Sequence, residues 1–352
     1  MRLLIIALSG IGDALMFIPA LRLIKNKFPE ITVDTLVMFK GVKDIYERNR
    51  NFDKVIYFDF ISRGLIPSLK FVLGLRKKYD ASINVYPSNR KEYNIINFLI
   101  GAKKRAGINY LRQNFKNLGW LNNVSITEND SLHNVQENIK LCEKLLNINF
   151  VEEPDLEFQL TKDDEKFAHE FFSVNNITGS DLVIGFHPGS ATLKNHINRR
   201  WEPEKFAALS KRLIEVLNAK MLIFGGPEER ELKKNIISKT NSANSFLVES
   251  GNLAQSAAVM KRCTVFISND SSLMHVASAL KLNVVAIIGP TNPNYIHPWH
   301  TAYKIITLNL DCSPCFIYSP RPLICFRNDV KFKCIKEINV DMVFDAVLNF
   351  AR

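Results

Sequence analysis

The sequence predicts an α/β protein built from two units, each with a parallel sheet. Three observations lead to this prediction. Short runs of valine, isoleucine and leucine alternate with segments of helical period through most of the 352 residues, which is the pattern of parallel strands joined by crossover helices. A stretch of low apolar density between residues 147 and 180, expected to be a linker, interrupts the alternation, which then starts again. The length also suits two domains better than one.

The first half should form a sheet whose ligand-binding loops follow the carboxyl ends of the strands. A helix from about residue 14 to 27 follows the first strand and is closed by Pro29, and another helix begins at Ser131. The expected strands are residues 3–8, 32–38, 54–58 and 81–85.

The second half repeats this pattern. The expected strands are residues 181–187, 219–226, 245–250, 263–270 and 283–290, with helices near 203–217, 228–238, 253–261 and 271–281. We therefore predict a first domain over residues 1–170, a second over 171–335, and a C-terminal helix over 336–352 that packs back on the first domain.

The net charge of the chain indicates which classes of partner it could bind but does not choose among them. Lys and Arg number 46 against 35 Asp and Glu, which leaves a formal net charge of +11. Such a surplus favours phosphates, anionic lipid surfaces or acidic substrates, although a generally basic soluble enzyme explains it equally well. No stripe of basic and aromatic residues is visible, so nucleic acid is not an expected partner.

The apolar run at the start of the chain lasts only from Leu3 to Leu8 before polar residues and glycine interrupt it. We interpret it as a buried first strand rather than an export signal. No run of about eighteen uncharged apolar residues follows, so no transmembrane segment is expected. These features predict a cytoplasmic protein whose six cysteines are reduced.

The loop after the first strand contains Gly10 and Gly12 but has Leu15 where a dinucleotide fingerprint has its third glycine. Binding of NAD is therefore disfavoured. Asp13 falls in the first turn of the following helix. It either complements the helix dipole or serves as a carboxylate base that accepts the proton of a substrate hydroxyl.

The loop after the strand at 181–187 reads HPGSATLKNHINRRW. Its backbone N–H groups and the hydroxyl of Ser190 suit the oxygens of a diphosphate. Lys194, Arg199 and Arg200 supply positive charge, and a guanidinium can bind a diphosphate with two hydrogen bonds. A solvated basic loop is an equally good interpretation. His187, at the strand end, is expected to pack or form hydrogen bonds rather than to catalyse.

Two further loops carry polar groups at strand ends. Glu228 and Glu229 stand at a helix start, where they complement the dipole or accept hydrogen bonds from ribose hydroxyls or a base amino group. Ser271 and Ser272 lie beside the unpaired N–H groups of the next helix, a natural anion site. Asp270 would bind sugar hydroxyls or act as the N-cap.

His275 lies one helical turn beyond Ser271, on or near the same face, although a lone histidine there is more often structural. Because all of these loops follow strands of one sheet, we expect them to converge on one site.

Taken together, the segments LSGIGDALMFIPALR, GFHPGSA, RRWEPEKFAALSKRL, IFGGPEE and SNDSSLMHVASALKLNVVAIIGPTNP resemble glycosyltransferase family 9, the lipopolysaccharide heptosyltransferases. The resemblance spans nearly the whole chain, in the family's order. It implies the GT-B architecture, with two Rossmann-like domains whose parallel sheets face a central cleft. The N-terminal domain would hold the acceptor and the C-terminal domain the nucleotide sugar.

By position, the resemblance implies that Asp13 is the catalytic base, with Gly10 and Gly12 at the acceptor. The donor-binding residues implied are Ser190, Arg200, Glu228, Glu229, Asp270, Ser271, Ser272 and His275. Two positions depart from the family: Ser272 stands where many members have glycine, and Arg200 where lysine is also seen, which keeps the charge but alters its geometry. No catalytic metal ligand is expected.

The activity implied is inverting, metal-independent transfer of a sugar from a nucleotide sugar. The sugar would be heptose from ADP-heptose, and the acceptor an acidic glycolipid such as the lipopolysaccharide core, at the inner face of the cytoplasmic membrane. The alternative is a non-catalytic protein of the same fold that binds a nucleotide or glycan. Retention of both Asp13 and the donor loop favours the enzyme.

Residues 63–78, RGLIPSLKFVLGLRKK, combine apolar and basic side chains. They could lie on an anionic membrane surface, but an ordinary amphipathic crossover helix is the favoured interpretation.

The tail contains four cysteines at the spacing C-x2-C-x9-C-x8-C. Four reduced thiols can bind structural zinc, but only one pair has the tight spacing of a zinc site, so zinc is left open here. The four are Cys312, Cys315, Cys325 and Cys334.

Overall fold

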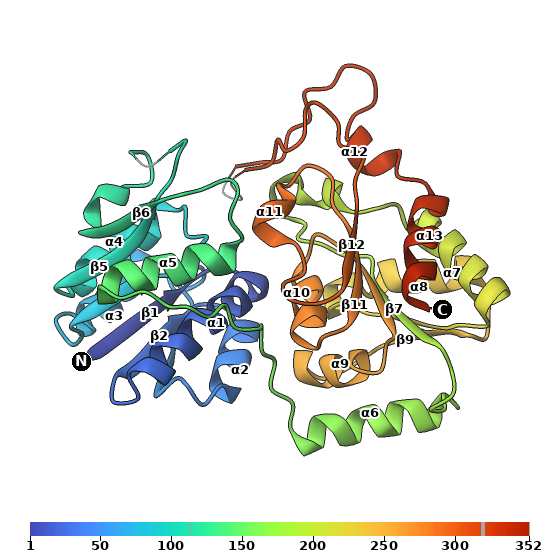
Figure 1. The fold of residues 1–352 in the computed structure, drawn as a ribbon, viewed down its shortest axis with the longest axis horizontal. Helices are drawn as coiled ribbons and strands as arrows, with labels where there is room; N and C mark the ends of the chain where they lie inside the picture. Colours follow the sequence, from blue (N-terminus) through green and yellow to red (C-terminus); the bar gives the residue numbers. More distant parts are fainter. Residues whose placement is uncertain (114, 318–320, 352) are drawn as a thin grey trace. The chain divides into compact units, whose positions relative to one another are not determined.

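The computed structural model describes residues 1–113, 115–317 and 321–351, and the chain divides into two compact units, Met1–Gln159 and Leu160–Arg352 (Figure 1). The division falls before the helix α6 (Lys162–Val174), not at residue 170 as predicted. The reason is packing, because α6 lies against α9 (Leu253–Met260) of the second unit.

In its described part, the first unit has six parallel strands in the order β3-β2-β1-β4-β5-β6. All four predicted strands are present. Two strands were missed, because β5 (KRAGIN) and β6 (VSIT) lack the apolar runs by which buried strands are recognised. The bounds are β1 Arg2–Ala7, β2 Thr32–Val37, β3 Lys54–Tyr57, β4 Ala81–Asn84, β5 Lys104–Asn109 and β6 Val124–Thr127.

Helices cover both faces of this sheet (Figure 1). Alternate residues of β1, Leu4 and Ile6, pack against helices α3 and α4 on one face. On the other face α1 packs against α2 and α5. The bounds are α1 Ile11–Lys27, α2 Lys40–Arg48, α3 Leu65–Gly74, α4 Lys91–Ile100, the 3-10 turn η1 Gly119–Leu121 and α5 Asn134–Leu146.

The second unit has the same architecture, and its described strands run parallel in the order β12-β11-β10-β7-β8-β9. The five predicted strands are present, and β7 and β10 are buried along their whole length, as expected for strands covered on both faces. The strand β12 was missed, because YKII begins with two exposed residues. The bounds are β7 Val183–His187, β8 Lys220–Ile223, β9 Ser245–Leu247, β10 Val265–Asn269, β11 Asn283–Ile287 and β12 Tyr303–Ile306.

One face of the second sheet packs against helices α7, α8 and α13, while α9 and α10 contact each other and α10 contacts β10 and β11. The helices are α7 Pro203–Leu217, α8 Arg230–Thr240, α10 Ser272–Ala279 and α13 Val340–Ala351. The shorter elements are η2 Leu193–Arg199, η3 Pro227–Glu229, α11 Pro293–Ile296 and α12 Lys333–Lys336.

The C-terminal helix α13 belongs to the second unit, not to the first as the sequence predicted. Its apolar residues Phe344 and Val347 are buried in the core beneath α7 and the sheet. The chain leading into α13 is fixed by the buried Trp201, whose Nε1 donates to the carbonyl of Ile338 at 2.9 Å.

The expected linker contains structure as well, because residues 162–174 form α6. The charged start of this segment is a capping box: Thr161 Oγ1 accepts from the N–H of Asp164 at 3.3 Å, and Asp164 Oδ2 accepts from the N–H of Thr161 at 2.8 Å. Ala168 and Phe172 then bury the inner face of α6. Within the described ranges, no helix has both the length and the apolar character needed to cross a membrane.

Candidate active site

In the first unit, Asp13 occupies the third position of α1, at the carboxyl edge of the sheet. The side chain is half-buried, and its Oδ2 accepts a hydrogen bond from the N–H of Gly10 at 3.3 Å. Gly10, the N-cap, is exposed and Gly12 is buried. The carboxylate therefore accepts a hydrogen bond from the N-cap of α1. It lies at the edge where parallel sheets bind ligands.

Two tyrosines hold this turn from opposite faces of the sheet. Tyr93 in α4 donates to the carbonyl of Leu8 at 2.7 Å, and Tyr46 in α2 donates to the carbonyl of Ala14 at 2.9 Å. Burial, and then the charge of Asp13, raises the pKa of Tyr46; burial also raises the pKa of Tyr93 to about 12. Both phenols therefore stay protonated beside the carboxylate. Sequence reasoning missed them, because lone tyrosines in distant helices carry no local signal.

In the second unit, His187 joins three of the loops that the sequence singled out. It is the last residue of β7. Its Nδ1 lies 2.8 Å from Ser271 Oγ at the start of α10, and its Nε2 lies 2.8 Å from Glu229 Oε2 in η3. The loops after β7, β8 and β10 thus come together as predicted, and His187 is the hydrogen-bonding residue it was expected to be.

Glu229 is buried among protein partners. Besides His187, it contacts Arg200 Nη2 at 3.1 Å and accepts from the N–H of Gly226 at 3.2 Å. Burial opposes ionisation, yet the hydrogen bond from His187 and the charges of His187 and Arg200 hold the pKa of Glu229 below its usual value. The hydrogen bonds of the Glu229 carboxylate are therefore made within the protein, whereas the side chain of Glu228 is exposed.

The loop after β7 is anchored at both ends. Arg200 donates to the carbonyl of Ser190 and, at 3.4 Å, to the Ser190 hydroxyl. At the end of β10, Asn269 donates to the carbonyl of Pro188 at 2.8 Å and accepts from the N–H of Trp201 at 2.9 Å. The guanidinium of Arg200 is thereby held beside Ser190 and Glu229.

Asp270 forms an ion pair with the neighbouring arginine. Its Oδ2 lies 2.6 Å from Arg199 Nη1 and accepts from the hydroxyl of Thr291, also at 2.6 Å. The Arg199 guanidinium stands 5.0 Å from the ring centroid of Phe316. The expectation that Asp270 might cap α10 is wrong, because the N-cap is Ser271.

The start of α10 has an N-cap whose side chain does not accept from the helix. The Ser271 hydroxyl instead contacts His187 and, at 3.0 Å, Ser268 Oγ, while Ser272 is half-exposed. One turn further, burial lowers the pKa of His275 to about 4, so the ring is neutral at pH 7, and its Nδ1 is buried with no described partner. Because the Ser271 side chain does not cap α10, the helix dipole and the first-turn N–H groups are suited to bind an anion.

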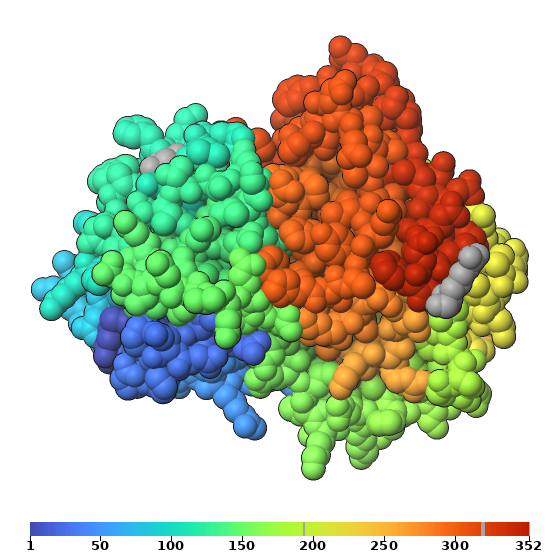
Figure 2. All heavy atoms as spheres, in the orientation of Figure 1, coloured from blue at the N-terminus to red at the C-terminus, as the bar shows by residue number. Residues whose placement is uncertain are grey.

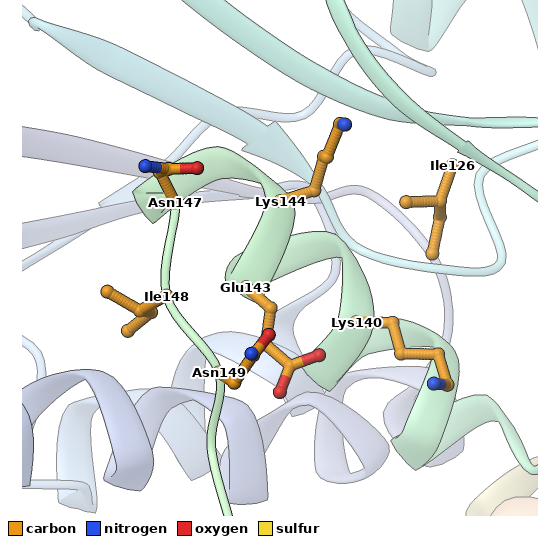
Figure 3. Close-up of a pocket in the computed structure, with 7 residues that line it drawn as sticks. All are labelled: Ile126, Lys140, Glu143, Lys144, Asn147, Ile148 and Asn149. Carbon is orange, nitrogen blue, oxygen red and sulfur yellow. The ribbon is translucent and has the colours of Figure 1, made fainter.

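A shallow hollow of about 410 Å³ in the first unit carries none of the predicted site residues. It is built from Ile126 in β6, the last turns of α5 and the chain that follows (Figure 3). One of its polar groups, Glu143, already accepts from the N–H of Phe150 at 2.7 Å. We therefore assign no chemistry to this hollow.

The four tail cysteines differ in exposure. Cys312 and Cys315 are exposed, whereas Cys334 is buried in the core of the second unit. Part of the chain between β12 and α12 stands out from the second unit (Figure 2). The N–H of Phe332 donates to Cys325 Sγ at 3.2 Å. Among the described residues, no group of three His, Cys, Asp or Glu side chains is arranged to hold a metal ion.

Comparison with known proteins identifies the family of this chain. The model of glycosyltransferase family 9 (heptosyltransferase) matches residues 69–321. The chain belongs to glycosyltransferase family 9. It is a glycosyltransferase with the two Rossmann-like units of the GT-B class, as its motifs predicted.

Several members of this family are similar over most of their length. Lipooligosaccharide heptosyltransferase 2 of Haemophilus influenzae is 26% identical, with 88% of this chain and 89% of that protein covered. The structure of Escherichia coli ADP-heptose LPS heptosyltransferase II has a TM-score of 0.76 at 20% identity, covering 100% and 98%. The E. coli heptosyltransferase WaaC with ADP-2-deoxy-2-fluoro heptose has a TM-score of 0.69 at 19% identity, covering 99% of each chain. These structures share the fold.

Proposed function

We propose that this family 9 enzyme transfers heptose from ADP-heptose to a hydroxyl of a lipopolysaccharide core or related acidic glycolipid, with inversion and without a catalytic metal ion. The observation that carries the proposal is the start of α10, where polar loops meet beside two arginines. Relatives whose names include ADP-heptose and lipooligosaccharide support the choice of donor and acceptor.

The donor diphosphate would lie at the N-terminus of α10. The first-turn N–H groups, the Ser272 hydroxyl and the helix dipole bind its oxygens there. Arg200, held beside Ser190, supplies positive charge. The Ser271 hydroxyl is already engaged with His187, so its part is to fix the helix start.

The nucleoside and sugar would use the remaining side chains of the same sheet edge. Glu228 is exposed and would accept hydrogen bonds from the ribose hydroxyls, while buried Glu229 positions Arg200. Asp270 would hold Arg199 in place and offer its second oxygen to the sugar hydroxyls. His275, neutral and buried, would support the first turn of α10.

In the reaction, Asp13 takes the proton of the acceptor hydroxyl, bound near Gly10 and Gly12. The acceptor oxygen forms a bond to the anomeric carbon as the bond between that carbon and the diphosphate oxygen breaks, so the configuration inverts. The negative charge that develops on ADP is stabilised by α10 and Arg200, the part that a divalent cation performs in other transferases. Transfer therefore requires both units.

The acceptor class also implies where the enzyme works. A glycolipid acceptor lies in a membrane, and the net charge of +11 favours an anionic surface. We place the enzyme in the cytoplasm, at the inner face of the cytoplasmic membrane.

The decisive experiment incubates the purified chain with ADP-heptose and lipopolysaccharide truncated before its heptoses. We expect a product heavier by one heptose, of opposite anomeric configuration to the donor, formed equally well with EDTA present. The melting temperature measured with ADP-heptose and with UDP- and GDP-sugars shows which nucleotide the donor site binds. Absence of transfer from every nucleotide sugar, despite tight donor binding, would support the non-catalytic alternative.

The Asp13→Asn variant tests the proposed base. The amide oxygen can still accept from the Gly10 N–H but cannot take a proton, so kcat should fall by about 10²–10⁴ with donor affinity unchanged. Asp163→Asn, at an exposed position near the start of α6, is the matched control. Activity near the wild-type value in Asp13→Asn removes Asp13 from the base role.

A further inference from the structure

Helix α3 exposes a stripe of large apolar side chains. Leu65 and Ile66 are 83% and 81% exposed, and Leu69 and Leu73 are 43% and 41% exposed. Positions 65, 69 and 73 follow one another at four-residue spacing, and Ile66 lies beside them on the helix surface. We call these four residues the outer stripe.

The outer stripe is not the face that α3 uses to pack on its own sheet. Val72 and Leu75 are buried in the core with helix α4, and Phe71 stacks on Phe58 with ring centroids 4.1 Å apart. The helix is therefore apolar on both faces, which differs from the ordinary amphipathic crossover helix favoured from the sequence. An exposed apolar stripe of this kind marks an interaction surface.

Positive charge surrounds the outer stripe. Residues 63–78 contain five basic residues and no acidic ones, and Lys70, Arg76 and Lys77 are exposed. The nearest acids along the chain, Asp59 and Asp80, already accept hydrogen bonds from backbone N–H groups. Apolar side chains flanked by cations complement a bilayer of anionic lipids, whose phosphates bind the cations while its hydrocarbon accepts the apolar groups.

The stripe also lies at the right edge of the sheet. Because α3 follows β3, its first residues, including Leu65 and Ile66, stand at the carboxyl edge. The turn that carries Asp13 follows β1 at this same edge. Two strand spacings separate β3 from β1 in the sheet, which is roughly 10 Å. A bilayer lying along the outer stripe, from the basic residues that follow α3 to its start, would present its headgroups to the edge that carries Asp13.

We propose that the outer stripe of α3 inserts into the interfacial layer of an anionic bilayer and so delivers a membrane-embedded acceptor to the first unit. Only the delivery step rests on the proposed function, because binding to lipid needs neither donor nor acceptor.

Vesicle sedimentation of the full chain tests the proposal. We expect phosphatidylcholine vesicles containing phosphatidylglycerol to bind the wild type, and binding to the double variant Ile66→Ser/Leu69→Ser to weaken by about tenfold or more. Lys77→Gln/Lys78→Gln should weaken binding only when phosphatidylglycerol is present. The matched control, Val174→Ser/Val216→Ser, removes exposed apolar side chains of α6 and α7 and should bind as the wild type does.

Three results would overturn the proposal: no binding of the wild type, equal binding of the outer-stripe variant, or a wild-type dimer that this variant abolishes without any vesicle binding. In the last case the partner is a second copy of the chain. The outer-stripe variant should still transfer sugar to a deacylated, water-soluble acceptor. If vesicles bind as expected but the wild type transfers no sugar to any acceptor, the proposed function fails and the docking surface stands.

Discussion

His187 Nδ1 lies 2.8 Å from Ser271 Oγ, so the last residue of β7 holds the N-cap of α10. The other ring nitrogen, Nε2, faces Glu229, whose pKa is lowered. An ionised carboxylate only accepts hydrogen bonds, so Nε2 carries a proton. Nδ1, on the other side of the ring, contacts the Ser271 hydroxyl. One histidine thus fixes both the orientation of the N-cap and the carboxylate that contacts Arg200.

Replacement of His187 by alanine should weaken both the fold and the donor site. Glu229 loses a buried hydrogen-bond partner, so we expect the free energy of unfolding to fall by about 1–3 kcal/mol. The affinity for ADP should fall about tenfold, because Ser271 is no longer held. Urea denaturation and titration calorimetry measure the two effects, and His169→Ala on the exposed side of α6 is the control. An unchanged ADP affinity would show that the N-cap does not depend on His187.

Substitution of Gly189 by alanine tests how closely the loop after β7 approaches Glu229. A Cβ at Gly189 would overlap the Glu229 carboxylate, so the carboxylate must leave the position in which it contacts His187 and Arg200. We expect a loss of about 1–3 kcal/mol in the free energy of unfolding, typical of overpacking, and weaker ADP binding. At Gly179 a Cβ meets nothing within 4 Å, so Gly179→Ala should be neutral. Equal melting temperatures for the two variants would contradict the packing described here.

The convergence of the donor loops could be predicted from the sequence, because topology alone brings the ends of parallel strands to one edge. The pairing within the site could not. Neighbouring arginines take different partners: Arg199 binds Asp270 and Arg200 binds Glu229. Only one of two adjacent glutamates, Glu229, points inward, and the phase of a short 3-10 turn decides which one. No local pattern encodes these choices.

For the fold as well, some elements could be predicted from the local sequence and others could not. The buried strand β7, within DLVIGFH, is recognisable because both of its faces contact helices. The helix α6 was predicted as linker, since its first turn, KDDE, is charged and its buried face is narrow. The place of α13 depends on contacts with α7, far away in the chain, which periodicity alone cannot assign.

The buried ring of His275 should make the protein sensitive to mild acid. Burial lowers its pKa to about 4, so between pH 6.5 and 4 the unfolded chain binds a proton that the folded protein does not. Stability therefore falls as the pH drops through this window, by on the order of 3 kcal/mol. His275→Gln lacks this titration, and urea denaturation from pH 7.5 to 4.5 should show its stability declining less than that of the wild type. Parallel curves would contradict the burial of a neutral ring.

Glu137, in the first turn of α5, should have the opposite dependence on pH. Burial raises its pKa to about 7; Oε1 accepts from the N–H of Asn129 at 2.6 Å, while Oε2 is buried with no described partner. As the pH rises from 4.5 to 7, the unfolded chain loses its proton first, so the folded protein is progressively destabilised.

Glu137→Gln removes this ionisation while its amide oxygen still accepts from Asn129. At pH 8 we expect the variant to be more stable than the wild type by about 1–2 kcal/mol, after the cost of burying the amide N–H₂ is subtracted. At pH 5 that cost is no longer offset, so the gain should vanish or reverse. Glu152→Gln, at an exposed position of the same unit, should show no such change. A gain at pH 5 equal to that at pH 8 would mean that Glu137 is ionised at both pH values, contrary to its burial.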